Sequence, residues 1–316
     1  MNKVFPLIIC VFALGITLYL LPEFAAFFGF EPLNQSCLSP IVFVSDDNGE
    51  TFNKTYWSGN LAPSIYDFEA DSQDPSFIFA ATNQGLFMSR DQGDHWYRYS
   101  DLEGKLAKAN VYQIEKSGNK PGQFFISLFK NGQGGIYETD DRFFTLKKIF
   151  DTKEAAAYKL ISLADKLYLG LSDGRLISYS LNDSGFKLIA AVGSPITDIT
   201  IKNSQIYLAT RAKEIWTGNI SGGDFKSLKE EQPSQSAHTA SLLGANLSTI
   251  VAKKPIKTIL PDNQGGIYLA AADKLYRSVN QGKNWQLILD APGRQVSSLN
   301  LEISGRIIVG TGNTND

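Results

Sequence analysis

Acidic side chains are the residues of this sequence with the clearest capacity for chemistry. Several lie in or near a series of short apolar segments: Asp67, Glu69, Asp71, Glu115, Asp198 and Asp262. Glycosidases use two carboxylates about 5 to 10 Å apart, one to donate a proton and one to act as nucleophile or base. The spacing along the chain singles out no pair, so a catalytic pair and ordinary solvated loop charges both remain open. We assign no catalytic residue.

Histidine and cysteine are scarce, with two of each in 316 residues. Two of each are too few for a disulfide framework or a Cys/His zinc site, so we predict no metal and no cofactor. His95 lies in a turn and His238 in a polar loop, and neither has a Ser/His/Asp arrangement around it. The 30 Lys and Arg against 32 Asp and Glu lack the positive excess that binds phosphates, which argues against a nucleic-acid partner.

A short apolar segment that ends in small residues recurs along the chain. The copies are SFIFAAT (76–82), QFFISLF (123–129), KLYLGLS (166–172), SQIYLAT (204–210), GGIYLAA (265–271) and GRIIVGT (305–311). Each reads as a buried strand, preceded by one further strand and followed, in every copy but the last, by another after a short turn. Four short antiparallel strands every 40 to 50 residues is the period of β-propeller blades.

The last repeat is truncated, which predicts how the fold closes. Residues 296–311 supply two strands before the chain stops, and PIVFVS (40–45) with ETFNKTYW (50–57) match the missing third and fourth strands. The sequence therefore predicts an all-β, six-bladed β-propeller over residues 39–316, closed by pairing of its N- and C-terminal strands.

A turn motif recurs between the third and fourth strands, as SDDNGETF (45–52), SRDQGDHW (89–96) and SVNQGKNW (278–285). Its acidic or amide side chain can accept backbone N–H groups across a tight hairpin, and its glycine suits a positive φ. The final aromatic ring is expected to pack into the blade. The motif residues are Ser45, Asp47, Gly49 and Phe52, then Ser89, Asp91, Gly93 and Trp96, and then Ser278, Asn280, Gly282 and Trp285.

This motif resembles the Asp-box, or BNR repeat, S-x-D-x-G-x-x-W, of sialidases, sortilin-type receptors and photosystem-assembly propellers. Weaker copies begin at Thr139, Ser180 and Thr217. The resemblance implies a structural box that faces away from the binding surface. A sialidase would also need three converging arginines and an early Arg-Ile-Pro element, but the first arginine is Arg90 and no Arg-Ile-Pro occurs. The assembly propellers usually have seven blades, so we carry over neither a photosynthetic role nor a basic binding patch.

The N-terminal segment has the character of a membrane span. Residues 4–21 contain no charge and Lys3 precedes them, which predicts a signal anchor over residues 1–30 with the remaining chain outside the cytoplasm. A linker over 31–38 follows. Cleavage or lipidation stays open as an alternative, although Cys37 has a poor lipobox context.

One stretch, residues 230–254, departs from the repeat as an insertion between the fifth and sixth blades. It is either a loosely packed excursion or an adaptable partner-binding loop. Without a catalytic constellation, the sequence predicts a membrane-tethered, extracytoplasmic scaffold that binds an envelope protein. The alternative is a carbohydrate-binding or carbohydrate-cleaving propeller, which exposed aromatic residues with paired acids at the funnel would favour.

Overall fold

The computed structural model divides the chain into residues 1–39 and 40–316 and describes residues of the second unit only. The predicted anchor, the linker and the 230–254 insertion lie outside the described residues. Within the described part, no helix is long and apolar enough to cross a bilayer. The described residues are 42–57, 63–202, 204–212, 214–223, 225–227, 256–261, 266–280, 284–301 and 305–312.

The prediction of an all-β fold is confirmed over the described residues, whose strands form six sheets. The first three sheets, from the inner to the outer strand, are β4 (Ile65–Ala70), β5 (Ile78–Thr82), β6 (Gly85–Ser89), β7 (His95–Arg98) and β3 (Tyr56–Trp57); β8 (Asn110–Lys116), β9 (Phe124–Lys130), β10 (Gln133–Thr139) and β11 (Lys147–Lys153); and β12 (Ala157–Leu163), β13 (Lys166–Leu171), β14 (Arg175–Ser180) and β15 (Phe186–Ala191).

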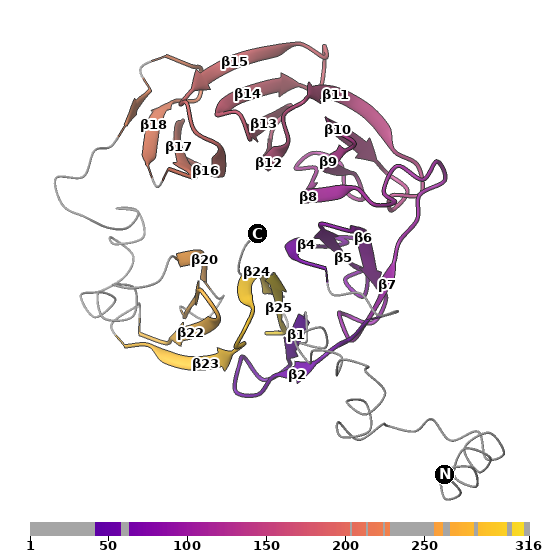
Figure 1. Cartoon of the computed structure of the whole chain (residues 1–316), viewed down its shortest axis with the longest axis vertical. Coiled ribbons are helices and arrows are strands. Elements are labelled where there is room, and N and C mark those ends of the chain that lie inside the picture. The colour runs from indigo at the N-terminus through magenta and orange to yellow at the C-terminus, as the bar shows by residue number, and fades with distance from the viewer. Residues whose placement is uncertain are drawn as a thin grey trace, which may run out of the picture. The chain divides into compact units, whose positions relative to one another are not determined.

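The next two sheets follow the same order and the last joins both ends of the unit. They are β16 (Ile196–Lys202), β17 (Gln205–Thr210), β18 (Ile215–Asn219) and β19 (Lys226–Ser227); β20 (Ile256–Pro261), β21 (Ile267–Ala271), β22 (Lys274–Ser278) and β23 (Gln286–Asp290); and β24 (Gln295–Leu301), β25 (Ile307–Gly312), β1 (Val42–Ser45) and β2 (Asn53–Lys54). Figure 1 shows the first strand of each sheet turned toward a common centre.

Burial follows the order of strands within a sheet. The central strands β5 and β6 are buried at every position because another sheet packs on each of their faces. The fourth strand, β7, buries only Trp96. Neighbouring sheets share one core: Phe79 of the first sheet lies 5.8 Å from Phe124 and 4.7 Å from Phe143 of the second, between ring centroids. The first and second sheets therefore depend on each other for burial.

The N-terminal strand β1 pairs antiparallel with the C-terminal strand β25, as predicted for the closing sheet. The register sets Val42 opposite Gly310 and Ser45 opposite Ile307, and all six residues of β25 are buried. The buried Arg294 adds a clasp, because its Nε donates to Thr311 Oγ1 at 2.8 Å and its Nη2 donates to the Pro63 carbonyl at 3.2 Å. The two ends of the unit are thus held by backbone and side-chain bonds.

The prediction that residues 50–57 form the fourth strand of this sheet is partly wrong. Only β2 pairs with β1, whereas β3 crosses to the next sheet and pairs in parallel with β7. There the Trp57 ring stacks on the Trp96 ring, with centroids 5.3 Å apart and planes 10° apart. The crossing thus packs the Trp57 ring against the core cluster that contains Trp96.

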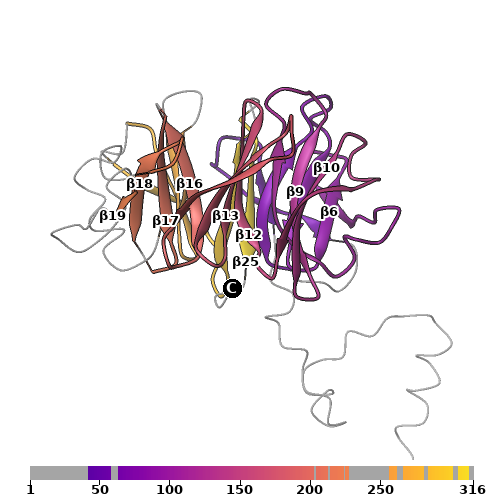
Figure 2. The same ribbon diagram turned by 90° about the horizontal axis from the view of Figure 1, so that it is seen from above.

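Strand pairing defines two faces of the sheets. Ile65 at the start of β4 lies opposite Thr82, which in turn lies opposite Gly85. Ala70 at the other end of β4 is on the same side as the β6–β7 turn, where a box motif lies. We call the side with the box motifs the box face. Figure 2 shows the strands of neighbouring sheets running between the two faces.

Replacement of Trp96 by alanine is expected to lower the free energy of unfolding by roughly 3–5 kcal/mol, because its fully buried ring would leave a cavity. Chemical denaturation measures the loss. Tyr97→Ala is the matched control, since the adjacent ring is 52% exposed, and its cost should stay near 1 kcal/mol or below. Equal losses in both variants would contradict the assigned packing.

Candidate functional site

The box motifs form one repeated hydrogen-bond pattern. In the first, Ser45 Oγ donates to Asp47 Oδ1 at 2.7 Å and accepts from the Gly49 N–H at 2.8 Å. Asp47 Oδ1 also accepts the N–H of Thr51 at 2.9 Å. Gly49 has a φ of 88°, which agrees with the positive φ predicted for the motif glycine. The side chains thus bind the turn's own backbone.

The other two strong copies repeat this geometry. Ser89 donates to Asp91 at 2.8 Å, and Asp91 accepts the His95 N–H at 2.9 Å. Gly93, with φ of 98°, donates its N–H to Ser89 Oγ at 2.7 Å, and Trp96 Nε1 donates to the Gly93 carbonyl at 2.7 Å.

In the third strong copy, Ser278 donates to Asn280 at 3.1 Å, and Asn280 accepts the Asn284 N–H at 2.8 Å. Gly282 lies outside the described residues. Phe52 and Trp285 are half-buried.

The copy that begins at Thr139, one of the weaker matches to the motif, has the full hydrogen-bond pattern. Thr139 Oγ1 donates to Asp141 at 2.8 Å, and Asp141 accepts the Thr145 N–H at 3.0 Å. Phe143 occupies the glycine position with φ of 66°, a costly conformation for a bulky residue. Its ring is fully buried in the core between the first two sheets, so packing compensates for the backbone strain.

The box carboxylates are committed to the turns. Hydrogen bonds from Thr51 and Ser45 hold the pKa of Asp47 far below its usual range. Burial opposes ionisation of Asp91, but hydrogen bonds from His95 and Ser89 outweigh it and lower that pKa as well. Acids that stay ionised and saturated with donors within a turn are poor general acids. A binding site is therefore expected away from the box face.

The inner strands share a β-bulge at one position, near the face opposite the boxes. A bulge leaves one residue outside the ladder and re-aims its side chain. The residues skipped by the register are Tyr66, Tyr112, Tyr158, Thr197, Lys257 and Ser297. Three consecutive sheets thus carry a tyrosine at the bulge, and we call this side of the sheets the tyrosine face.

The three tyrosines contact one another across the sheets. The Tyr66 and Tyr112 rings stack with centroids 5.2 Å apart, and the Tyr112 and Tyr158 rings meet edge to face at 4.9 Å. The Arg211 guanidinium lies over the Tyr158 ring, 5.6 Å from its centroid. All three tyrosines are half-buried, so each is fixed by packing and still reaches solvent. We call Tyr66, Tyr112, Tyr158 and Arg211 the tyrosine row.

Beside this row, side chains of one inner strand cap backbone N–H groups of the next. An inner strand is a sheet edge, so its outward N–H groups need acceptors. Three bonds of this kind connect the first three sheets: Ile114 N–H to Asp67 Oδ2 at 3.1 Å, Leu160 N–H to Gln113 Oε1 at 2.7 Å, and Ser162 N–H to Glu115 Oε1 at 2.9 Å. Polar residues on the axis thereby connect neighbouring blades.

Two ion pairs lie beside these polar residues, and we call all of them together the axial group. Lys116 Nζ lies 2.8 Å from Glu69, and Lys159 Nζ lies 3.5 Å from Asp198. Lys159 is one of the few cations near Asp67 and Glu115, and its charge acts on both carboxyls. The axis thus combines four acids with two lysines.

Burial changes the proton affinity of these acids. It raises the pKa of Asp67 to about 7, although the charge of Lys159 opposes the rise. Burial also raises the pKa of Glu115 to about 7 and raises the pKa of Glu69. For Lys159, burial favours the neutral amine, but Asp198 and the other nearby acids outweigh it and the pKa rises. Perturbed carboxyls of this kind are typical of functional sites.

The six acids named from sequence separate into three groups. Asp67, Glu69, Glu115 and Asp198 are on the axis. Asp71 is buried on the box face and pairs with Arg142 at 2.6 Å, and Asp262 lies outside the described residues. Sequence reasoning missed the tyrosines. Their signal was periodicity, because Tyr66, Tyr112 and Tyr158 recur at intervals of 46 residues.

The axial group offers hydrogen bonding, charge and aromatic contact to a ligand. Among the described residues, no group of three or more His, Cys, Asp or Glu is placed to hold a metal ion. Asp67 and Glu115 could exchange protons near neutral pH. Both also accept backbone N–H bonds, which ties them to the support of the inner strands.

Comparison with known proteins identifies the fold class. No protein-family model and no curated protein matches the chain. The chain is similar to the solved structure of YCF48 from Cyanidioschyzon merolae, with TM-score 0.58, 9% identity and coverage of 78% of this chain and 95% of that one. A chain of the mitotic checkpoint complex gives TM-score 0.55 and 11% identity, covering 80% and 87%.

The extracellular domain of BT4673 from B. thetaiotaomicron is also similar, with TM-score 0.50 and 17% identity. The match covers 83% of this chain and 33% of that longer one. At these identities the likeness concerns the fold alone. Together with the four-stranded antiparallel sheets, it places the chain among β-propeller proteins.

The raised pKa values predict how stability depends on pH. Because the folded chain binds protons at Asp67 and Glu115 more tightly than the unfolded chain, these groups favour folding at low pH, and their contribution is lost as pH rises from about 4 to 7. The double variant Asp67→Asn/Glu115→Gln should flatten this part of the profile and be more stable than wild type at pH 8. Thermal unfolding of the purified full-length chain between pH 5 and 8 measures both effects.

The exposed acid Glu50 provides the control for this experiment. Glu50→Gln should leave the wild-type profile between pH 5 and 8 unchanged. A double variant that follows the wild-type profile would contradict the axial placement of the two proton-binding groups.

Proposed function

We propose that this chain is a membrane-tethered, extracytoplasmic β-propeller of six blades that acts as a non-enzymatic scaffold for a protein partner. The uncharged segment 4–21 supports the tether, and the six sheets of the described residues support the blade count. We infer that partner binding takes place on the tyrosine face.

The observation that carries this proposal is the tyrosine row. Tyrosine and arginine are the residue types most enriched, with tryptophan, at the energetic centres of protein interfaces. Here three half-buried tyrosines and Arg211 are held together on adjacent strands by ring contacts. Fixed rings lose little entropy on binding, so a partner gains the full benefit of the contact.

Similar folds support a protein partner in a general way. One of the similar chains belongs to the mitotic checkpoint complex, an assembly of proteins. The axial acids Asp67 and Glu115 are weak candidates for catalysis, because each already accepts a backbone N–H bond from an inner strand. A scaffold function requires no change in those bonds during binding.

Carbohydrate binding is the second candidate, and a specific observation favours it. Aromatic side chains and paired acids gather at the propeller axis, which is the combination expected of a carbohydrate site in a funnel. The rings of Tyr66 and Tyr112, however, stack on each other. Stacking occupies faces that a sugar ring would need, so we favour the protein partner.

Crosslinking on native membranes, followed by mass spectrometry, tests the proposal. The wild-type chain should give reproducible crosslinks to one envelope protein. The Tyr112→Ala/Arg211→Ala variant should lose them by about tenfold or more, the effect of a central contact worth at least 1.4 kcal/mol. Tyr97→Ala, which removes an exposed tyrosine from an outer strand, is the matched control and should retain them.

Two further results separate the alternatives. A variant lacking residues 233–252 shows whether the insertion contributes to the same contact. Absence of any protein crosslink, together with binding of the full-length chain to a glycan array that Tyr112→Ala abolishes, would reject the scaffold and establish the carbohydrate site.

A further inference from the structure

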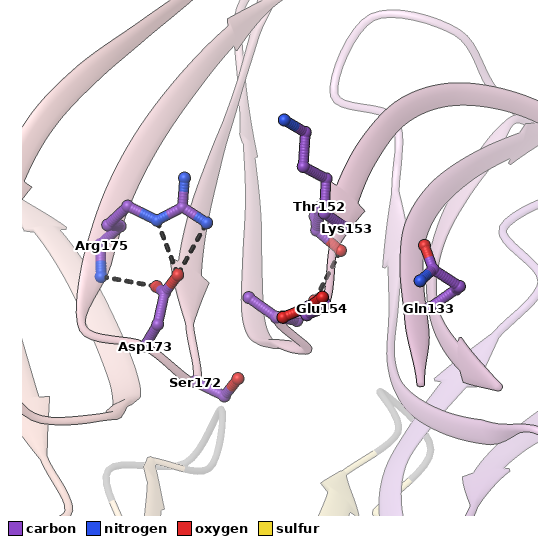
Figure 3. A pocket seen from close by; sticks show the side chains of 8 residues that line it. Gln133, Thr152, Lys153, Glu154, Ser172, Asp173 and Arg175 are labelled. Carbon is purple, nitrogen blue, oxygen red and sulfur yellow. Dashed lines mark hydrogen bonds and ion pairs between the residues drawn. The ribbon is translucent and has the colours of Figure 1, made fainter. Parts of the chain in front are cut away.

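A pocket is present on the tyrosine face, between the second and third sheets. It is an open pocket of about 690 Å³, within the range of small-molecule sites. One wall comes from the end of β11 and the connection to β12, and the other from the β13–β14 turn (Figure 3). The polar and charged side chains considered below are Gln133, Lys153, Glu154, Ser172, Asp173 and Arg175.

The first wall is fixed by close packing. Thr152 Oγ1 donates to the Ala155 carbonyl at 2.7 Å, which closes the turn that carries Lys153 and Glu154. A Cβ on Gly134 would lie 2.2 Å from both the Ala155 oxygen and Thr152 Oγ1. Only a glycine at position 134 allows this turn to approach β10 so closely. Within the turn, Lys153 has a φ of 57°.

The second wall is fixed by an ion pair. Arg175 Nε and Nη2 each lie 2.7 Å from Asp173 Oδ2, and the Arg175 N–H donates to Asp173 Oδ1 at 3.1 Å. The Ala156 N–H donates to Ser172 Oγ at 3.0 Å, which links this turn to the start of β12. Asp173 therefore orients the guanidinium through its Nε and Nη2 edge, and the Nη1 donors are available to a ligand.

Three other polar groups in the pocket are uncommitted. Among the described residues, no side-chain hydrogen bond or ion pair engages Gln133, Lys153 or Glu154. In Figure 3 the Lys153 ammonium and the free end of Arg175 point in the same direction from opposite walls, and Glu154 lies on the same wall as Lys153. The pocket thus offers two cationic donors and one free carboxylate, and it is neutral overall.

We propose that this pocket binds a small zwitterion, a free amino acid or a short peptide with both ends unblocked. The ligand carboxylate would lie between Lys153 and Arg175, and its ammonium group would lie against Glu154. Gln133 supplies a donor and an acceptor for a peptide group. A purely anionic ligand would meet Glu154 and Asp173, and a purely cationic one would meet Lys153 and Arg175, so opposite charges at the two ends fit best.

The site is separate from the tyrosine row, although the two are close in the chain. Ala155 lines the pocket and Tyr158 follows three residues later. The zwitterion site needs no protein partner and is tested without one. Its success or failure leaves the proposed function to be judged by crosslinking.

Titration calorimetry on the full-length chain in nanodiscs tests the inference with four probes: L-alanine, L-alanyl-L-alanine, its N-acetyl derivative and its C-terminal amide. At least one unblocked probe should bind. Removal of either end charge from the dipeptide should weaken binding about tenfold, the value of one charge-assisted contact of roughly 1.4 kcal/mol. Stronger binding of alanine than of the dipeptide would identify amino acids as the source, and the reverse would identify peptides.

Variants assign each end of the ligand. Lys153→Met should weaken binding of the unblocked probe about tenfold and make it less sensitive to blocking of the carboxylate, because only Arg175 then contacts that end. Glu154→Gln should weaken it similarly and make it insensitive to blocking of the ammonium group. Lys54→Met, at an exposed lysine on β2, is the matched control and should bind as wild type does. Equal binding of blocked and unblocked dipeptides, or no binding of alanine and dialanine at 10 mM, would overturn the proposal.

Discussion

The pairing of β1 with β25 joins residues 42–45 to residues 307–310, and the remaining sheets depend on it. The first sheet buries β5 and β6 at every position because the second sheet covers one of its faces and the closing sheet covers the other. Sequential sheets are joined by the chain itself, but the closing sheet is assembled from both ends. Backbone hydrogen bonds and the Arg294 clasp therefore perform there what a covalent connection performs elsewhere.

The same architecture explains the polar axis. Inner strands are edges whose N–H groups face no further strand, and Asp67, Gln113 and Glu115 supply the missing acceptors. Packing these acceptors into the interior raises carboxyl pKa values toward neutrality. The bulge that ends regular pairing on each inner strand also turns Tyr66, Tyr112 and Tyr158 toward one another. A structural requirement thus places carboxyls of raised pKa and a row of tyrosine rings on neighbouring inner strands.

The sequence predicted the strands well because alternation and burial are local properties. The box turns also followed from sequence, since Ser45, Asp47 and Gly49 interact within one turn. The sequence could not predict that Asp67 and Glu115 lie near each other, because their proximity depends on how one blade packs against the next. Trp57 joined a different sheet than expected, and Phe143 took a glycine position, because burial of an aromatic ring outweighed local preference in both cases.

The crossing of β3 to the first sheet has a mechanical consequence. Residues 42–57 pair with β25 through β1 and with β7 through β3, so one short stretch of chain joins the closing sheet to its neighbour. A pulling force applied at the N-terminal end would act first along the β1–β25 ladder, where several backbone bonds resist sliding together. The Trp57–Trp96 stack lies behind that ladder as a second resistance. Attachment to a moving support at this end would therefore load the joint that closes the ring.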